Sequence, residues 1–280
     1  MITLYYLSNI PKIVRKICLL SLFISLSACL FPQYKSIGVP EIRNIMMSYY
    51  GGGAQNWKIV DDEQGNIYVA NNNGILRFDG SIWESFSVEN KSIVRSLSSG
   101  SGGKVYVGAY NEIGVLEKSD ENGISYSSLN DLIPEYAKDF DDIWNIYRTR
   151  WGIIFQSFEY IFIYNNEIIK VIDPGDRFGY SFYVDNDYYV VEKGLGLRLL
   201  VKDSLVTVSD DALFTMDEIH SIAKINSGDL LIGTLDNGLY ILADGVLSPW
   251  DTEISAELRE SKLYCGTAHN NRYLFGTIKR

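Results

Sequence analysis

Polar and aromatic side chains recur in the sequence where short apolar runs end, and these residue types are suited to binding a ligand. Asparagine, aspartate and glutamate hydrogen-bond hydroxyl or peptide groups, and an aromatic ring offers a flat apolar face. The candidate ligand-binding residues are Asn71, Asn73, Tyr110, Glu112, Glu159, Tyr160, Asp236 and Asn237. Tight turns alone also favour asparagine and glycine, so a purely structural role stays open for each candidate.

Residues that could perform acid–base or metal chemistry are few. The chain has 2 histidines: His220 lies inside an apolar strand pattern and His269 in a polar turn. We expect His220 to hydrogen-bond within its blade and His269 to be solvated. No Gly-x-Ser-x-Gly or His-Glu-x-x-His motif occurs, and the acidic run at 139–142 lacks the spacing of a calcium loop, which predicts a solvated loop. We therefore expect no catalytic residue, no metal and no cofactor in this chain.

The composition favours a folded, strand-rich and acidic protein. The 280 residues are 46% hydrophobic and 13% aromatic, enough for a substantial core. With 25 basic and 35 acidic side chains the net charge is −10, which disfavours nucleic acid as a partner. The 20 tyrosines, 24 glycines and only 6 prolines favour short strands joined by tight turns.

Residues 1–29 have the pattern of an export signal. Lys12, Arg15 and Lys16 precede an apolar stretch at 17–26, whose ten residues would span about 15 Å as a helix, too little for a bilayer. The stretch ending at Cys29 resembles the bacterial lipobox, which predicts lipidation of Cys29. Ordinary cleavage near Ala28, with Cys29 incidental, is the alternative. We expect a periplasmic or outward-facing protein that meets a membrane only through this signal or lipid anchor.

Two further features concern the rest of the chain. Residues 30–54 are expected to form a lead-in segment, in which Gly51, Gly52 and Gly53 lack the Lys-Ser/Thr of a phosphate loop and are expected to be flexible. Cys265 has no partner for a structural disulfide, and its apolar surroundings predict a small buried side chain.

A repeat runs through residues 55–280. Six segments share a polar turn followed by a run of β-branched or aromatic residues, and they lie at 65–70, 103–108, 152–156, 187–192, 228–233 and 271–276. Their spacing averages about 41 residues, from (276 − 70)/5. A short apolar strand precedes most of them and a further strand follows. Asp79-Gly80 and Asp244-Gly245 then suit two-residue hairpins.

Four short antiparallel strands every 40 to 45 residues are typical of a propeller blade. The sequence therefore predicts an all-β fold, a β-propeller of four-stranded blades. We expect five blades and half of a sixth, from a ring of seven. The half blade indicates either an unusual closure or the N-terminal part of a longer reading frame.

The blade core at 228–240 resembles the two-component-regulator propeller repeat, with its Gly, apolar strand, Gly-Thr and Asn-Gly-Leu pattern. Residues 37–44, followed by Gln55-Asn56-Trp57, are similar to the mature N-termini of exported sensor regions in bacterial triple-tyrosine-motif regulators. The resemblance covers residues 37–280. It implies an extracytoplasmic sensor that leads to a triple-tyrosine module, a membrane helix and a histidine kinase or helix-turn-helix regulator.

The sequence departs from that family in two respects. None of the downstream output domains is present, so we expect this segment to be non-catalytic, with an unidentified small molecule or glycan as partner. The lipobox-like Cys29 is unusual for a protein that signals through its own membrane helix. The alternatives are a free-standing surface lipoprotein that binds glycan, and an exported propeller enzyme such as a lyase or glycosidase.

Overall fold

The computed structural model describes Val14, Lys16 and residues 42–119, 123–225, 228–269 and 272–279. The chain divides into two units, Met1–Asn44 and Ile45–Arg280, and all described strands lie in the second. The predicted export signal, apart from two residues, and Cys29 lie outside the described residues, as do residues 30–41 of the predicted lead-in. The domain boundaries at 29 and 54 stay predictions.

Short antiparallel strands make up nearly all of the described fold. Five sheets have four strands and a sixth has two, and in each of them strands consecutive in sequence are hydrogen-bonded neighbours. This meander is the blade of a β-propeller, so the predicted fold is confirmed. The size of the complete ring stays a prediction. The strands of the first three sheets are β1 (Asn56–Asp61), β2 (Ile67–Asn71), β3 (Gly74–Phe78), β4 (Trp83–Phe86), β5 (Val94–Ser99), β6 (Val105–Ala109), β7 (Glu112–Ser119), β8 (Gly123–Ser128), β9 (Asn145–Thr149), β10 (Gly152–Gln156), β11 (Ile161–Tyr164) and β12 (Ile169–Ile172).

The remaining sheets continue the same pattern, and short helices connect or precede them. The strands are β13 (Phe178–Val184), β14 (Asp187–Glu192), β15 (Gly196–Val201), β16 (Ser204–Ser209), β17 (Ile219–Lys224), β18 (Leu230–Thr234), β19 (Gly238–Ala243), β20 (Val246–Pro249), β21 (Leu263–His269) and β22 (Arg272–Thr277). The helices are α2 (Met47–Tyr50), α3 (Leu213–Met216), α4 (Ser255–Ser261) and the 3-10 turns η1 (Ser101–Gly103), η2 (Asn130–Leu132) and η3 (Glu135–Ala137). The six repeated segments of the sequence correspond to the second strand of each sheet: β2, β6, β10, β14, β18 and β22.

The two predicted Asx-Gly turns differ from each other. Asp244 and Gly245, with φ angles of 49° and 81°, form a two-residue hairpin, as predicted. At Asp79 the turn is longer, and four residues separate the paired ends of β3 and β4. The Asp79 carboxylate accepts hydrogen bonds from the N–H groups of Ser81 and Ile82, at 2.8 and 2.9 Å. That side-chain bonding stabilises a wider loop than the two-residue one expected there.

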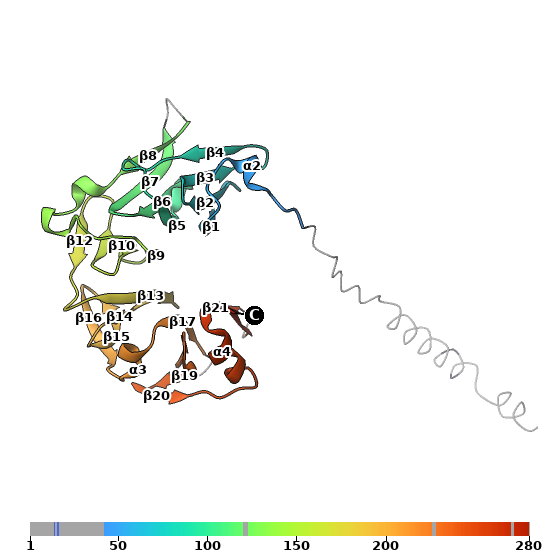
Figure 1. Cartoon of the computed structure of the whole chain (residues 1–280), viewed down its shortest axis with the longest axis vertical. Coiled ribbons are helices and arrows are strands. Elements are labelled where there is room, and N and C mark those ends of the chain that lie inside the picture. Colours follow the sequence, from blue (N-terminus) through green and yellow to red (C-terminus); the bar gives the residue numbers. More distant parts are fainter. Residues whose placement is uncertain are drawn as a thin grey trace, which may run out of the picture. The chain divides into compact units, whose positions relative to one another are not determined.

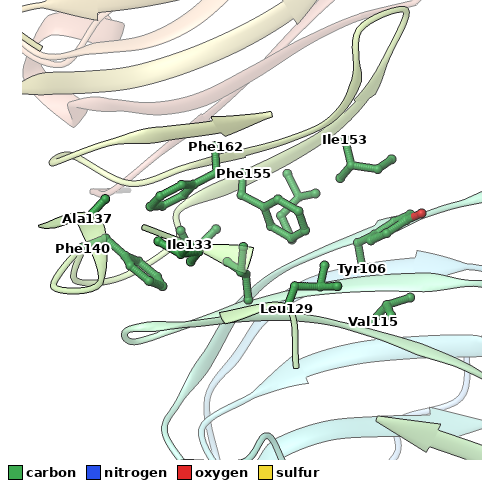
Figure 2. Close-up of a cluster of buried hydrophobic side chains, with 12 residues drawn as sticks. Tyr106, Val115, Leu129, Ile133, Ala137, Phe140, Ile153, Phe155 and Phe162 are labelled. Carbon is green, nitrogen blue, oxygen red and sulfur yellow. The ribbon is translucent and has the colours of Figure 1, made fainter. Parts of the chain in front are cut away.

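Each apolar core cluster lies between two neighbouring sheets. Figure 2 shows the cluster between the second and third sheets, where Phe155 and Phe162 face Tyr106 and Val115. The rings of Tyr106 and Phe155 meet edge to face, with centroids 6.1 Å apart. Equivalent clusters join the other consecutive sheets. Stability in this fold therefore comes from stacking one blade on the next.

The first strand of each sheet lies on the inside of the arc that the sheets of Ile45–Arg280 form (Figure 1). These strands contact one another in chain order, from β1 with β5 to β17 with β21. Gly108, at the end of β6, permits this approach, because a Cβ atom there would collide with Ser96 and with Ile143 of the third blade. The hydroxyl of Ser96 also donates to the carbonyl oxygen of Ile143, at 2.7 Å.

The prediction that Cys265 is buried is wrong, because its side chain is exposed. The register between β21 and β22 shifts between Leu263 and Cys265, which places a bulge at Tyr264. Beyond the bulge, Gly266 faces Ser221 of the fifth sheet. Because neighbouring strand residues point to opposite faces, Cys265 points away from that sheet.

The expectation of a flexible glycine segment is also wrong. The N–H of Gly53 donates to the Oδ1 atom of Asn71 at 2.7 Å, and the Nδ2 atom of Asn71 donates back to the Gly53 carbonyl at 2.8 Å. A Cβ atom on Gly52 would approach Leu76 within 2.9 Å. The segment after α2 is therefore packed against the first sheet.

Candidate functional site

One large side chain from each of the six sheets lies at the same position along the inner strands. In five sheets this residue lies within a register shift of the first strand, and in the third sheet it directly precedes β9. A bulge leaves one residue outside the ladder and re-aims its side chain. We call these six residues the inner belt: Trp57, Arg95, Trp144, Tyr180, His220 and Tyr264.

The first half of the inner belt is a cation between two indole rings. The guanidinium carbon of Arg95 lies 4.3 Å from the ring centroid of Trp57 and 4.9 Å from that of Trp144. Its Nε atom lies 2.7 Å from the carboxylate of Asp142. Asp142 belongs to the acidic run that was expected to be solvated, yet its side chain is only 15% exposed. Asp142 therefore fixes the orientation of Arg95 instead of facing solvent.

The middle of the inner belt is aromatic. The rings of Trp144 and Phe158 are stacked, with centroids 5.4 Å apart and an interplanar angle of 23°. Tyr180 meets both of them edge to face, at 6.1 Å from Trp144 and 5.3 Å from Phe158. Burial, together with the charge of Glu218, raises the pKa of Tyr180 against the opposing effect of Arg95. The Tyr180 hydroxyl is therefore neutral at physiological pH and can donate a hydrogen bond.

The second half repeats the arrangement of a nitrogen-rich group between two aromatic rings. The ring centroid of His220 lies 5.2 Å from that of Tyr180 and 5.5 Å from that of Tyr264. Its Nδ1 atom lies 3.0 Å from the carbonyl oxygen of Tyr264, and Nε2 lies 3.2 Å from the carboxylate of Glu218. His220 was expected to hydrogen-bond within its own blade, but the partner of its Nδ1 atom, Tyr264, lies in the next sheet. Both ring nitrogens therefore lie within hydrogen-bonding distance of an oxygen atom of the chain.

A pocket of about 510 Å³ adjoins the aromatic middle of the inner belt, between the third, fourth and fifth sheets. Tyr180 and Phe158 form part of its wall. Its charged lining comes from the turns between second and third strands and from the segments that precede β13 and β17. The charged lining residues are Arg177, Lys193, Asp217, Glu218 and Asp236. A concave, partly aromatic cavity with a few charged groups has the character of a small-molecule site.

Two of the predicted ligand-binding residues are buried inside their blades. Asn71 is 0% exposed and hydrogen-bonds the segment at Gly53, as described above. Glu112 is 3% exposed and accepts hydrogen bonds from the Tyr126 hydroxyl at 2.6 Å and the Asn130 amide at 3.2 Å. Both residues hold loops in place and are not accessible to a ligand, so they are removed from the predicted set of ligand-binding residues.

Three other predicted residues lie at or near the pocket. Asp236 lines it. Asn237 follows in the same turn, and its Nδ2 atom donates to Asp217 at 2.9 Å. Glu159 lies 3.6 Å from the Nε atom of Arg177, another lining residue. The turns that carry Glu159, Asp236 and Asn237 thus lie around the pocket, whereas their role in ligand binding stays a prediction.

The last three predicted residues, Asn73, Tyr110 and Tyr160, do not line the pocket. Asn73 is exposed and its N–H donates to Asn71. Tyr110 is 47% exposed. Tyr160 donates to the carbonyl of Tyr136 at 3.2 Å.

Sequence reasoning missed most of the inner belt as a binding surface, and it also missed Lys193 in the turn of the fourth sheet. A signal was present: a large aromatic or cationic residue stands directly after an apolar one at Val94-Arg95, Ile143-Trp144, Ile219-His220 and Leu263-Tyr264. That repeat interrupts the alternation expected of a regular strand, as a bulge does.

No cluster of three or more His, Cys, Asp or Glu side chains suited to a metal ion occurs among residues 42–119, 123–225, 228–269 and 272–279. Within the same ranges, no helix is long and apolar enough to cross a membrane. His269 is exposed at the end of β21.

No protein-family model and no curated protein matches the chain. Solved structures do match. Virginiamycin B lyase from Staphylococcus aureus superposes with a TM-score of 0.61 and 14% identity, over 83% of this chain and 80% of that one. An extracellular domain assigned to the hybrid two-component system BT3049 of B. thetaiotaomicron gives 0.58 and 16%, over 88% of this chain and 34% of that one. The extracellular domain of BT4673 superposes with a TM-score of 0.51 and 16% identity, over 80% of this chain and 37% of that one.

At these identities the matches establish the fold, and the chain is a β-propeller. The two B. thetaiotaomicron matches are consistent with the two-component-regulator propeller that the blade motifs resemble. The chain spans about a third of the length of those extracellular domains.

Proposed function

We propose that the chain is a non-catalytic, extracytoplasmic sensing propeller of a bacterial signal-transduction regulator, and that it binds a small molecule or glycan at the inner belt and the adjoining pocket. Signalling would require output domains outside this sequence. The observation that carries the proposal is the continuous row of aromatic and cationic side chains, to which all six sheets contribute.

The geometry supports binding in preference to catalysis. Both ring nitrogens of His220 already contact oxygen atoms of the chain, the carbonyl of Tyr264 and the carboxylate of Glu218, which supports a structural or binding role for this side chain. Aromatic faces and fixed hydrogen-bonding groups give affinity and orientation without a reactive group. The extracellular domains with the same fold belong to proteins assigned as two-component systems, which supports the sensing role.

A thermal-shift screen of small molecules and oligosaccharides against the full chain tests this function. Ligand at about 100 times its Kd stabilises the folded state by about 2.7 kcal/mol, which a melting curve detects. We expect Tyr180→Leu to abolish the stabilisation. Tyr136→Leu is the matched control, because Tyr136 is 64% exposed and lies outside the inner belt and the pocket. Stabilisation that persists unchanged in Tyr180→Leu contradicts the proposed site, and a screen without any stabilising compound contradicts ligand sensing.

A propeller lyase is the second candidate, and the match to virginiamycin B lyase favours it. A variant of that enzyme in which one histidine is replaced by alanine, solved with quinupristin, is described as catalytically inactive. This chain also places a histidine, His220, on the inside of its propeller. Incubation with quinupristin, followed by mass spectrometry, separates the two candidates. Turnover by the native chain that is lost in His220→Ala supports the lyase, and an unchanged substrate supports the sensor.

A free-standing glycan-binding lipoprotein is the remaining alternative. Fatty-acid labelling in cells that is lost in Cys29→Ala supports it, because lipidation would anchor the chain without a membrane helix. Absence of labelling in the native protein removes this alternative and leaves the sensor.

A further inference from the structure

Three residues contact the guanidinium of Arg95, namely Trp57, Trp144 and Asp142, while its terminal nitrogens remain without a hydrogen bond to the described residues. Two indole rings enclose the guanidinium plane, and Asp142 lies against Nε. Although the Asp142 carboxylate lies close to it, the buried Nε atom makes no hydrogen bond, and neither terminal nitrogen hydrogen-bonds a residue that the structure describes. The side chain as a whole is 17% exposed. The two terminal nitrogens are therefore hydrogen-bond donors that no described residue uses, on a side chain that two indole rings hold in place.

Such a pair suits one chemical group. A guanidinium presents parallel N–H bonds that match the two oxygens of a carboxylate, and this bidentate pairing is stronger than a single neutral hydrogen bond. An arginine that is already immobilised loses less side-chain entropy when it binds. The stacking on Trp57 and Trp144 supplies that immobilisation before any ligand arrives.

We propose that Arg95 recognises a carboxylate, and that the ring of the same ligand packs against the exposed part of Trp57. Trp57 is 37% exposed and lies beside the guanidinium, so a ligand with a carboxylate attached to a flat or chair-shaped ring contacts both residues. This inference rests on the proposed function and names the ligand class: an acid with a ring, either a sugar acid or an aromatic acid.

The nearby charges favour a carboxylate over a more highly charged anion. Asp142 offsets the positive charge of Arg95, and the chain as a whole carries −10. A doubly charged phosphate is repelled more strongly by that surrounding charge than a singly charged carboxylate. Recognition by directed hydrogen bonds therefore outweighs general electrostatic attraction at this site.

The chain contains a matched control for Arg95. Arg150 also stacks on an indole, 4.2 Å from the centroid of Trp151, and also pairs with an aspartate, Asp187, at 3.5 Å. It lies in the turn between β9 and β10, at the opposite end of that strand pair from Trp144. Arg95→Lys and Arg150→Lys thus remove the same guanidinium chemistry in two different places.

The experiment is calorimetric titration of the full 280-residue chain with two acids and their neutral amides. The sugar-acid probe is a glucuronate disaccharide and the aromatic probe is indole-3-acetate. We expect at least one acid to bind at least tenfold more tightly than its amide. Arg95→Lys is expected to remove that preference, and Arg150→Lys to retain it. The acid that shows the preference identifies the source of the carboxylate.

Three results overturn the carboxylate inference: equal binding of acid and amide, a preference that survives in Arg95→Lys, or no binding of either acid. Trp57→Leu provides a second variant if Arg95→Lys does not fold, and it is expected to lower the affinity of the chain for the acid. A neutral compound that stabilises the chain in the thermal-shift screen, while the acids show no preference, leaves ligand sensing standing and removes only the role of Arg95.

Discussion

The Nδ1 atom of His220 lies 3.0 Å from the backbone carbonyl oxygen of Tyr264, so a side chain of the fifth sheet is bonded directly to the first strand of the sixth. The hydroxyl of Ser96 makes the same kind of bond to the carbonyl of Ile143, from the second blade to the third. Polar bonds between inner strands thus supplement the apolar clusters that join neighbouring blades. This relationship gives His220 a structural role in addition to its place in the inner belt.

The first prediction concerns that bond. Replacing His220 by phenylalanine keeps an aromatic ring between Tyr180 and Tyr264 but removes both hydrogen bonds. We expect the free energy of unfolding to fall by about 1 kcal/mol, the usual contribution of a hydrogen bond. Urea denaturation measures the change. Val246→Phe, at a position that is 69% exposed, is the comparison and is expected to change stability by less than about 0.5 kcal/mol. Equal effects of the two substitutions would contradict the bond between blades.

The second prediction concerns the close approach at Gly108. A methyl group there would collide with Ser96 and Ile143, so we expect Gly108→Ala to destabilise the chain by about 1–3 kcal/mol. Gly175→Ala is the control, because the nearest atom to its Cβ would be 3.6 Å away, an ordinary contact. Thermal unfolding of the two variants provides the measurement. A Gly108→Ala protein as stable as Gly175→Ala would show that the blades are not packed this tightly.

The third prediction is a pH dependence at Asp62. Burial alone raises the pKa of Asp62, but hydrogen bonds from Asn66, Gln64 and Tyr68 outweigh it and leave the pKa below its usual value of 3.8. Because the folded-state pKa is lower than the unfolded one, the stabilisation is complete above about pH 4 and is lost as the pH falls through the folded-state pKa.

Comparison with Asp62→Asn tests this pH dependence. At pH 7 the native chain should be more stable than Asp62→Asn by about 1–3 kcal/mol, since the variant loses hydrogen bonds to a charged group. The difference should narrow as the pH falls from 3.8 towards the lower folded-state pKa, below which the native carboxyl is neutral. Asp210→Asn, at an exposed carboxyl, is the control for the loss of one negative charge. A pH-independent gap would contradict the role assigned to the Asp62 charge.

The fourth prediction concerns Cys265, which is exposed. We expect iodoacetamide to alkylate it in the native protein at a rate close to that in urea, because no side chain has to move to admit the reagent. Peptide mass spectrometry assigns the modified residue. Alkylation that occurs only in denaturant would instead show that Cys265 is buried, as its apolar surroundings in the sequence predict.

The sequence allowed the second strand of every blade to be predicted, because each apolar run is bounded by polar turn residues such as Gly65 and Gly103. It could not reveal the inner belt, whose members are far apart in sequence and meet only when the blades stack. The bulge at Tyr264 also shifted the alternation by one residue, which explains why Cys265 was assigned to the wrong face. Asn71 and Glu112 were assigned to ligand binding because loop bonding and ligand bonding use the same polar residue types.

The bulges of the inner strands separate the side-chain chemistry of the inner belt from the pairing of the strands. In five of the six sheets the belt residue lies within a register shift, outside the regular pairing of its first strand. A substitution there changes the chemistry presented on the inside of the propeller while the backbone pairs around it remain as they are. For the proposed ligand site, this means that the inner belt can change one blade at a time while the strand pairing of the scaffold is kept.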